Sequence, residues 1–253
     1  MGSTVFSETD SELKYLGELI ADFPCEKIPD VTYANKLLKT RYEQLDLKIP
    51  VFINEILHNK NLIDKINSIN TTLSLNNEKL PVIFYSLMLF FHSYLFDKIL
   101  NNAGKFRDLK DPNGGKIGFG GPDNRIAGNF RYSGIACNKI EEELNSCFLN
   151  LIDKPQDPVY CSMEFYRRFV KIHPFYDANG RIGRLIVSLY CRYHGYYIKW
   201  MEIDEKGNKT KFIKMLNECH KRENQEVYIL YLQRLVDYMK KFVVEIKNLT
   251  DMI

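Results

Sequence analysis

The chain has 253 residues, of which 45% are hydrophobic and 26% are charged. A chain of this length and composition can bury a sizeable core without disulfide or metal staples. Its 35 basic and 32 acidic residues leave a net charge of only +3, so it lacks the strong positive charge typical of nucleic-acid-binding proteins. We therefore expect no nucleic-acid partner.

A cytoplasmic protein is indicated by the cysteines, by the N-terminus and by the most apolar run of the chain. The six cysteines are scattered, and none forms a C-x-x-C pair or a cluster with histidines at zinc spacing. We expect them to be reduced and mostly buried thiols. The N-terminus has no basic segment followed by an apolar one, and the most apolar run, Val82 to Phe96, is shorter than a membrane span and contains His92. We predict a soluble protein with no membrane partner.

Hydrophobic periodicity predicts that most of the chain is helical. Prolines at positions 50, 81 and 158 lie near predicted helix starts, where the missing N–H has no structural cost. We predict an N-terminal helical region over residues 1–79, a candidate regulatory part, and a second, larger region over residues 80–253. The predicted helices span residues 31–46, 50–73, 79–101, 138–152, 158–172, 179–194, 208–221 and 224–248.

Residues 104–134 interrupt the helical pattern. This segment holds more than half of the chain's 14 glycines and cannot form a regular helix. Short runs such as KIGF and NFRYS, bounded by turn residues, indicate a hairpin or flap. A glycine-rich segment of this length in a compact domain is usually functional.

The stretch HPFYDANGRIGR, residues 173–184, places polar residues between two amphipathic helices. The second helix begins near Asn179 and Gly180, and its first free N–H groups form an anion site. Arg181 and Arg184 are three residues apart, so both guanidinium groups can reach one side of that helix end. This pattern predicts a phosphate-binding site.

Two further residues of the stretch add chemistry to that site. Asp177 would repel a bare anion, but a carboxylate beside phosphates suits a bridging Mg²⁺. A histidine side chain can titrate near neutrality, so His173 could act as a general base. Each residue alone has an ordinary interpretation, such as a helix cap, a turn residue or a solvated arginine. Only their combination favours a functional site.

The stretch matches every specified position of H-x-F-x-[DE]-[GA]-N-[GK]-R-x-x-R and therefore resembles the signature of the Fic family. FFHSYLFDKILNNAGKFR is also similar to the family's helix and its entry into the flap. EIDEKGNKTKFIKMLNECHKREN lies where the later helices of the family would be. The resemblance covers roughly residues 80–245. It implies a mostly α fold, a Fic-like helical bundle with a short β-hairpin flap beside the active-site loop, and it makes residues 80–253 the expected catalytic core.

The resemblance implies an enzyme that transfers AMP from ATP to a Ser, Thr or Tyr hydroxyl of a target protein, with auto-modification, and with Mg²⁺ as cofactor. The flap at about 104–134 would dock the target protein as an added strand. The resemblance also admits a homodimer. In family roles, His173 is the base, Asp177 holds Mg²⁺, Asn179 and Gly180 shape the anion hole, and Arg181 and Arg184 hold the outer phosphates.

Two alternatives stay open. The chain could be a regulatory or interaction module that binds a nucleotide without transferring any group. The site could also use another phosphate-containing donor, because the motif contacts phosphates rather than a base.

Many members of the family carry an inhibitory helix, [ST]-x-x-x-E-[GN], whose glutamate pairs with the last arginine of the motif. This chain has no strict match, and its near matches are SLNNEK (74–79), CHKREN (219–224) and KTRYEQ (39–44). Glu43 lies on a predicted helix at a suitable distance before the FFH segment and is our candidate. Its ordinary interpretation is a solvated partner of Lys36 or Lys39.

Overall fold

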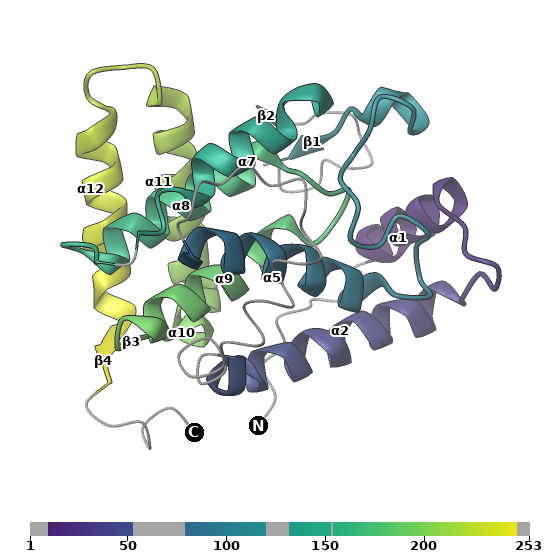
Figure 1. The fold of residues 1–253 in the computed structure, drawn as a ribbon, viewed down its shortest axis with the longest axis horizontal. Helices are drawn as coiled ribbons and strands as arrows, with labels where there is room; N and C mark the ends of the chain where they lie inside the picture. The colour runs from purple at the N-terminus through teal and green to yellow at the C-terminus, as the bar shows by residue number, and fades with distance from the viewer. Residues whose placement is uncertain (1–9, 53–78, 120–131, 153, 247–253) are drawn as a thin grey trace.

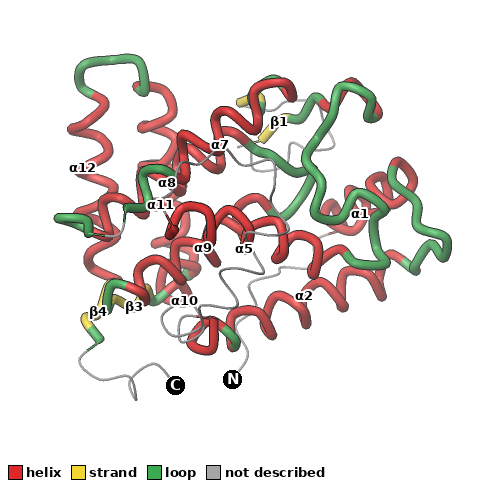
Figure 2. The backbone as a smooth tube through the Cα atoms, viewed as in Figure 1, coloured by secondary structure: helices red, strands yellow, loops and turns green. Residues whose placement is uncertain are grey.

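The computed structural model describes residues 10–52, 79–119, 132–152 and 154–246. The described chain is mainly helical, as Figures 1 and 2 show. Its α-helices are α1 (Asp10–Asp22), α2 (Val31–Leu47), α5 (Lys79–Phe96), α7 (Ile140–Phe148), α8 (Pro158–Ile172), α9 (Asn179–Tyr193), α10 (Trp200–Asp204), α11 (Lys206–Arg222) and α12 (Tyr228–Met239). Short 3₁₀ turns are η1 (Pro112–Gly115), η2 (Cys137–Lys139) and η3 (Lys240–Phe242).

Two small antiparallel sheets occur among the described residues. Strands β1 (Gly118–Phe119) and β2 (Tyr132–Ser133) pair within the predicted flap, with Phe119 opposite Tyr132. Strands β3 (Tyr196–Ile198) and β4 (Val243–Glu245) pair next to the end of α9. The predicted fold class, mostly α with a short β pair beside the candidate loop, is confirmed.

The helices pack around one hydrophobic core. Helix α9 lies against both α8 and α5, and α7 packs on α8. In Figure 1, α11 and α12 lie at one side of the molecule and α1 at the other, with α5 and α9 between them. Leu16 of α1 and Leu38 of α2 belong to the same buried cluster as Ile186 of α9. The division at residue 79 stays a prediction.

Local sequence explains how α8 and α9 are placed. Asp157 caps α8 by accepting a hydrogen bond from the Tyr160 N–H at 3.0 Å, and Pro158 occupies the first helical position. Gly183 lets α9 approach α8 closely, because a Cβ there would lie 3.0–3.1 Å from ring atoms of Tyr166 and Phe169. The two helices that carry the candidate loop are therefore fixed relative to each other.

The predicted helix over 224–248 is wrong at its C-terminal end. Helix α12 stops at Met239, and Val243–Glu245 forms strand β4 instead. The β-branched Val243 and Val244 suit an extended backbone, and β3 supplies partners for its N–H and C=O groups. A helical pattern in the sequence cannot reveal a partner strand that lies about 45 residues earlier.

Other boundaries differ less. Helix α5 ends at Phe96 rather than at residue 101, and α7 is preceded by a 3₁₀ turn and ends at Phe148. Helix α1 was not predicted. Three predicted segments lie wholly or mostly outside the described residues. They are the helix over 50–73 from residue 53 onward, SLNNEK up to residue 78, and flap residues 120–131.

All six cysteines are free thiols in the structure, and three of them, Cys147, Cys191 and Cys219, are buried. In the ranges that the structure covers, no helix has the length and apolar character needed to cross a membrane.

Candidate functional site

The candidate loop joins α8 to α9 through two residues in left-handed conformation. His173 ends α8 with φ of 51°, and its N–H still bonds to the Phe169 carbonyl at 3.0 Å. Ala178 precedes α9 with φ of 61°. Because Pro174 disfavours helical geometry at residue 173, the chain leaves α8 abruptly at this histidine. The six residues between α8 and α9, 173–178, thus form a sharp, defined turn.

His173 is held with one ring nitrogen facing its own helix. The residue is only 5% exposed, and Nδ1 lies 3.1 Å from the Val170 carbonyl oxygen. A carbonyl oxygen can only accept, so Nδ1 carries a hydrogen, and in the neutral imidazole Nε2 carries the lone pair. This tautomer is the one that a general base requires.

The flap covers His173. The Phe119 ring of β1 stacks on the imidazole with centroids 4.9 Å apart and planes 9° apart. Gly134, which follows β2, approaches the same residue, because a Cβ there would lie 3.2 Å from the His173 Cβ. The predicted flap and the predicted base are therefore in direct contact.

Asn179 holds the loop from inside. Its side-chain oxygen accepts from the Phe175 N–H at 3.0 Å, and its Nδ2 donates to the Phe175 carbonyl at 2.8 Å. The Phe175 ring is fully buried and stacks on His92 of α5 at 3.8 Å, while His92 Nδ1 accepts from the Gly104 N–H at 2.9 Å. The Asn179 side chain thus shapes the loop.

Asp177 and Arg181 lie together at the start of α9. One carboxylate oxygen of Asp177 accepts from the Ala178 N–H at 2.6 Å, and the other lies 3.1 Å from Arg181 Nη2. In the described ranges, no three His, Cys, Asp or Glu side chains form a group that could hold a metal ion alone. Asp177 could supply one carboxylate to a Mg²⁺ that a nucleotide's phosphates also bind.

Arg184 faces α10. Its Nη1 lies 2.9 and 2.8 Å from the two carboxylate oxygens of Asp204, and its guanidinium carbon lies 4.7 Å from the Trp200 ring centroid. Within the described residues, Nε and Nη2 of Arg184 make no hydrogen bond. One edge of this guanidinium is fixed by Asp204, and the other edge can donate to a ligand.

The N-terminus of α9 completes the arrangement. The first N–H groups of a helix have no acceptor within the helix, and Gly180 is exposed. Four of the predicted residues, Asp177, Asn179, Gly180 and Arg181, lie at this helix end, and His173 begins the loop that leads to it. The arrangement can bind an anion and offer a base beside it.

The comparison with protein families gives this arrangement a name. A sequence profile of the Fic/DOC family matches residues 83–191, which run from α5 into α9 and contain the whole loop. This part of the chain is a Fic domain.

Three solved structures are similar to this chain, and the first of them supports the same fold. The N-terminal Fic domain of a Bartonella effector protein (Bep) from Bartonella sp. AR 15-3 is 14% identical over 89% of this chain and 92% of that chain, with a TM-score of 0.51. BepC of Bartonella tribocorum with bound AMPPNP is 17% identical over 84% and 89%, with a TM-score of 0.46. A Bep Fic domain of Bartonella quintana with bound ADP is 18% identical over 65% and 74%, with a TM-score of 0.42. None of the curated proteins matches the chain.

Arg107 of the Fic domain is the last residue of the AGKFR run at the flap entry, and no role was predicted for it. Its buried guanidinium donates to the carbonyl oxygens of His173 at 2.7 Å, Ile135 at 3.0 Å and Ile172 at 3.2 Å, and also to that of Gly115. It therefore ties both ends of the flap to the end of α8. An arginine that follows glycine and an aromatic residue at the flap entry was the available signal.

Helix α1 also contacts the loop of the Fic domain. The Tyr15 hydroxyl donates to the Tyr176 carbonyl, and the Phe23 and Tyr176 rings lie 4.8 Å apart. Tyr176 in turn donates to Asp111 at 3.3 Å. No sequence signal linked this N-terminal helix to the residue before Asp177.

The candidate inhibitory Glu43 lies exposed on α2. Its neighbour Tyr42 is buried, and burial raises the pKa of that hydroxyl to about 12 against the opposing charges of Arg184 and Arg181. Helix α2 therefore runs past the two motif arginines, while the carboxylate that contacts Arg184 is Asp204. An inhibitory role for Glu43 stays a prediction.

Proposed function

We propose that this chain transfers AMP from ATP to a Ser, Thr or Tyr hydroxyl of a target protein in a Mg²⁺-dependent reaction. The observation that carries the proposal is the position of His173, whose Nε2 has the lone pair and whose loop leads directly into the anion-binding end of α9. Phosphoryl-type transfer depends mainly on positioning and charge neutralisation, which this loop offers together with a base.

In this mechanism His173 Nε2 takes the proton of the target hydroxyl as its oxygen attacks the α-phosphorus of ATP. A P–O bond forms to the target, the bond between the α- and β-phosphates breaks, and pyrophosphate leaves with the electron pair. The N–H groups at the start of α9, with Arg181 and the open edge of Arg184, would neutralise the phosphate charge. Asp177 would hold Mg²⁺, which supplies further charge neutralisation on the phosphates.

The stacking of Phe119 on His173 adds a requirement. The acceptor hydroxyl must reach an imidazole whose face is covered, so the β1–β2 pair would shift when a target docks. We infer that the flap both presents the target and shields the base from water.

The test is labelling with radioactive ATP. Incubated with Mg²⁺ and a cell lysate, the purified chain should attach label from α-labelled ATP, and none from γ-labelled ATP, to itself or to a lysate protein. His173→Ala should abolish the labelling, whereas His194→Ala, outside the loop, should retain it. Mg²⁺-dependent binding of ATP without transfer would instead identify a nucleotide-binding module. Transfer of label from a different labelled nucleotide, and not from ATP, would identify that nucleotide as the donor.

A further inference from the structure

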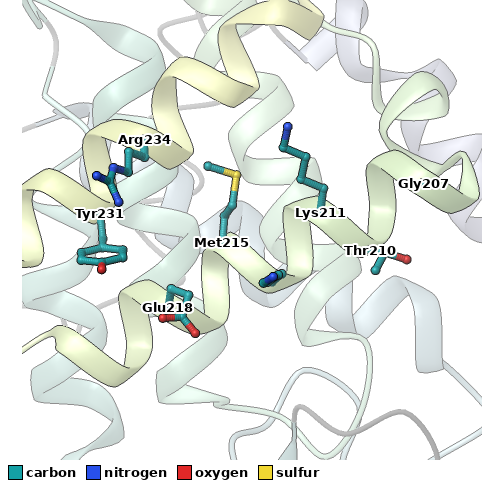
Figure 3. Close-up of a pocket in the computed structure, with 8 residues that line it drawn as sticks. Gly207, Thr210, Lys211, Met215, Glu218, Tyr231 and Arg234 are labelled. Atoms are coloured by element: carbon teal, nitrogen blue, oxygen red, sulfur yellow. The ribbon is translucent and has the colours of Figure 1, made fainter.

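A recess separate from the His173 loop lies between α11 and α12. It has a volume of about 510 Å³. Figure 3 shows its side chains in order, from Gly207 and Thr210 at one end, past Lys211 and Met215, to Glu218, Tyr231 and Arg234 at the other. We call this recess the α11–α12 groove, and its lining residues are Gly207, Thr210, Lys211, Lys214, Met215, Glu218, Tyr231 and Arg234.

An exposed apolar face of α12 continues the groove. Val227, Leu230, Tyr231 and Arg234 follow the spacing i, i+3, i+4 and i+7, so they share one side of the helix. Val227 is 45% exposed and Leu230 is 51% exposed. On the α11 side, Met215 contributes a partly buried apolar side chain. A third helix can pack into the groove between two antiparallel helices that present such an apolar face.

The groove is rimmed by positive charge. Lys211, Lys214 and Arg234 are exposed, and among the described residues that line the groove Glu218 is the one carboxylate. Glu218 already accepts from Lys221 at 2.8 Å and forms an ion pair with Arg222. The lining therefore leaves uncompensated cations around an apolar centre.

We propose that the α11–α12 groove docks an amphipathic helix of a partner protein whose apolar face is flanked by Asp and Glu side chains. A symmetric contact with a second copy of the chain would place the same cations opposite each other, which is unfavourable. A nucleic-acid backbone would leave Met215, Leu230 and Val227 without an apolar partner. The inference is independent of the proposed AMP transfer.

The experiment measures peptide binding by fluorescence anisotropy. The probe is a labelled helical peptide of about 18 residues with leucines at i, i+3, i+4 and i+7 and glutamates on both flanks. Two control peptides have the same composition with the leucines dispersed around the helix, or lysines in place of the glutamates. We expect the full-length chain to bind the probe about tenfold or more tightly than either control.

Variants on and off the groove locate the binding. Leu230→Asp and the double variant Lys214→Glu with Arg234→Glu should each weaken probe binding about tenfold or more. Ile229→Asp and Lys209→Glu are the matched controls, because both residues are exposed and neither lies among the lining residues or on the exposed apolar face of α12 that carries Leu230. They should leave the affinity unchanged.

Several outcomes would overturn the proposal. The proposal is wrong if the chain does not bind the probe, or if it binds all three peptides equally. It is also wrong if the control variants lose as much affinity for the probe as the groove variants do. A wild-type dimer that Leu230→Asp dissociates would assign the groove to a second copy. Oligonucleotide binding that the double charge variant abolishes would assign it to nucleic acid.

Discussion

His220 is a buried residue without an obvious reason to be polar. It is 6% exposed, lies beside the Phe119 and Tyr132 rings of the β1–β2 pair, and neither ring nitrogen has a hydrogen-bond partner among the described residues. Burial, with smaller contributions from Arg167 and Lys171, lowers its pKa to about 3. The imidazole is therefore neutral in the folded protein down to acidic pH.

This histidine makes stability fall in acid. The unfolded chain binds a proton near the ordinary pKa of 6.5 and the folded chain does not, so stability is lost as the pH falls from 6.5 towards 3. Between pH 6.5 and pH 5, the free energy of unfolding should fall by about 2 kcal/mol less in His220→Phe than in the unchanged protein. At pH 7 the stability of this variant should be unchanged or higher. Urea unfolding at several pH values measures both effects.

His92→Phe is the contrasting variant. Burial also lowers the pKa of His92 to about 3, but its Nδ1 accepts from the Gly104 N–H. This substitution should flatten the same pH dependence while lowering stability at pH 7 by about 1–3 kcal/mol, because the Gly104 N–H loses its acceptor. Equal losses at pH 7 for both variants would contradict our account of His220.

Asp204 is a positioning residue for Arg184. It contacts Nη1 only and orients the guanidinium over Trp200, so the other edge can meet phosphate. In the proposed reaction, Asp204→Asn should raise the KM for ATP about fivefold or more with a smaller effect on kcat. Glu202→Gln, on the same short helix and paired with Lys199, should change neither. A lower KM in Asp204→Asn would show that Asp204 competes with the nucleotide.

At the scale of the elements, the contact between α8 and α9 determines where the loop lies. Gly183→Ala places a methyl group 3.0–3.1 Å from the Tyr166 and Phe169 rings, so the helices must separate slightly. We expect a loss of about 1–3 kcal/mol in the free energy of unfolding and reduced labelling activity. Gly207→Ala in α11, where a Cβ meets nothing within 4 Å, should stabilise the protein by about 0.5–1 kcal/mol. Thermal or urea unfolding separates the two variants.

The elements also show how far sequence reasoning reaches. Periodicity predicted α2, α8 and α9 almost to the residue, because each has one apolar face and α2 and α8 also have an aspartate cap. It missed β4, whose partner strand is distant in the sequence. The motif identified the loop residues, whereas Asp204 and Phe119 reach Arg184 and His173 only through tertiary packing. No spacing rule connects residues 20 or more positions apart.

At the scale of the whole molecule, the N-terminal helix and the Fic domain meet at the loop. Tyr15 of α1 holds the Tyr176 carbonyl, immediately before Asp177. Whatever displaces α1 would therefore also disturb the residue proposed to hold Mg²⁺. This contact would be the physical basis of the regulatory role predicted for the N-terminal region.

Tyr15→Phe tests that connection. Loss of one hydrogen bond should lower stability by about 1 kcal/mol, while transfer activity should fall more than stability because the loop is less well held. Tyr33→Phe, at a position that is 61% exposed, is the control and should change neither. Labelling rates and urea unfolding on the same samples compare the two effects, and unchanged labelling by Tyr15→Phe would remove α1 from the mechanism.

Arg107 has a consequence for how the protein can change over evolution. One guanidinium binds the carbonyl groups of Gly115 and Ile135, so a single side chain holds the two ends of the intervening segment together. The entropy of closing a loop grows only with the logarithm of its length, about 0.6 kcal/mol for each doubling. Insertions between the two anchors should therefore cost little stability and should leave the contact of Arg107 with the His173 carbonyl intact. In the proposed reaction, target choice could then change without moving the backbone at His173.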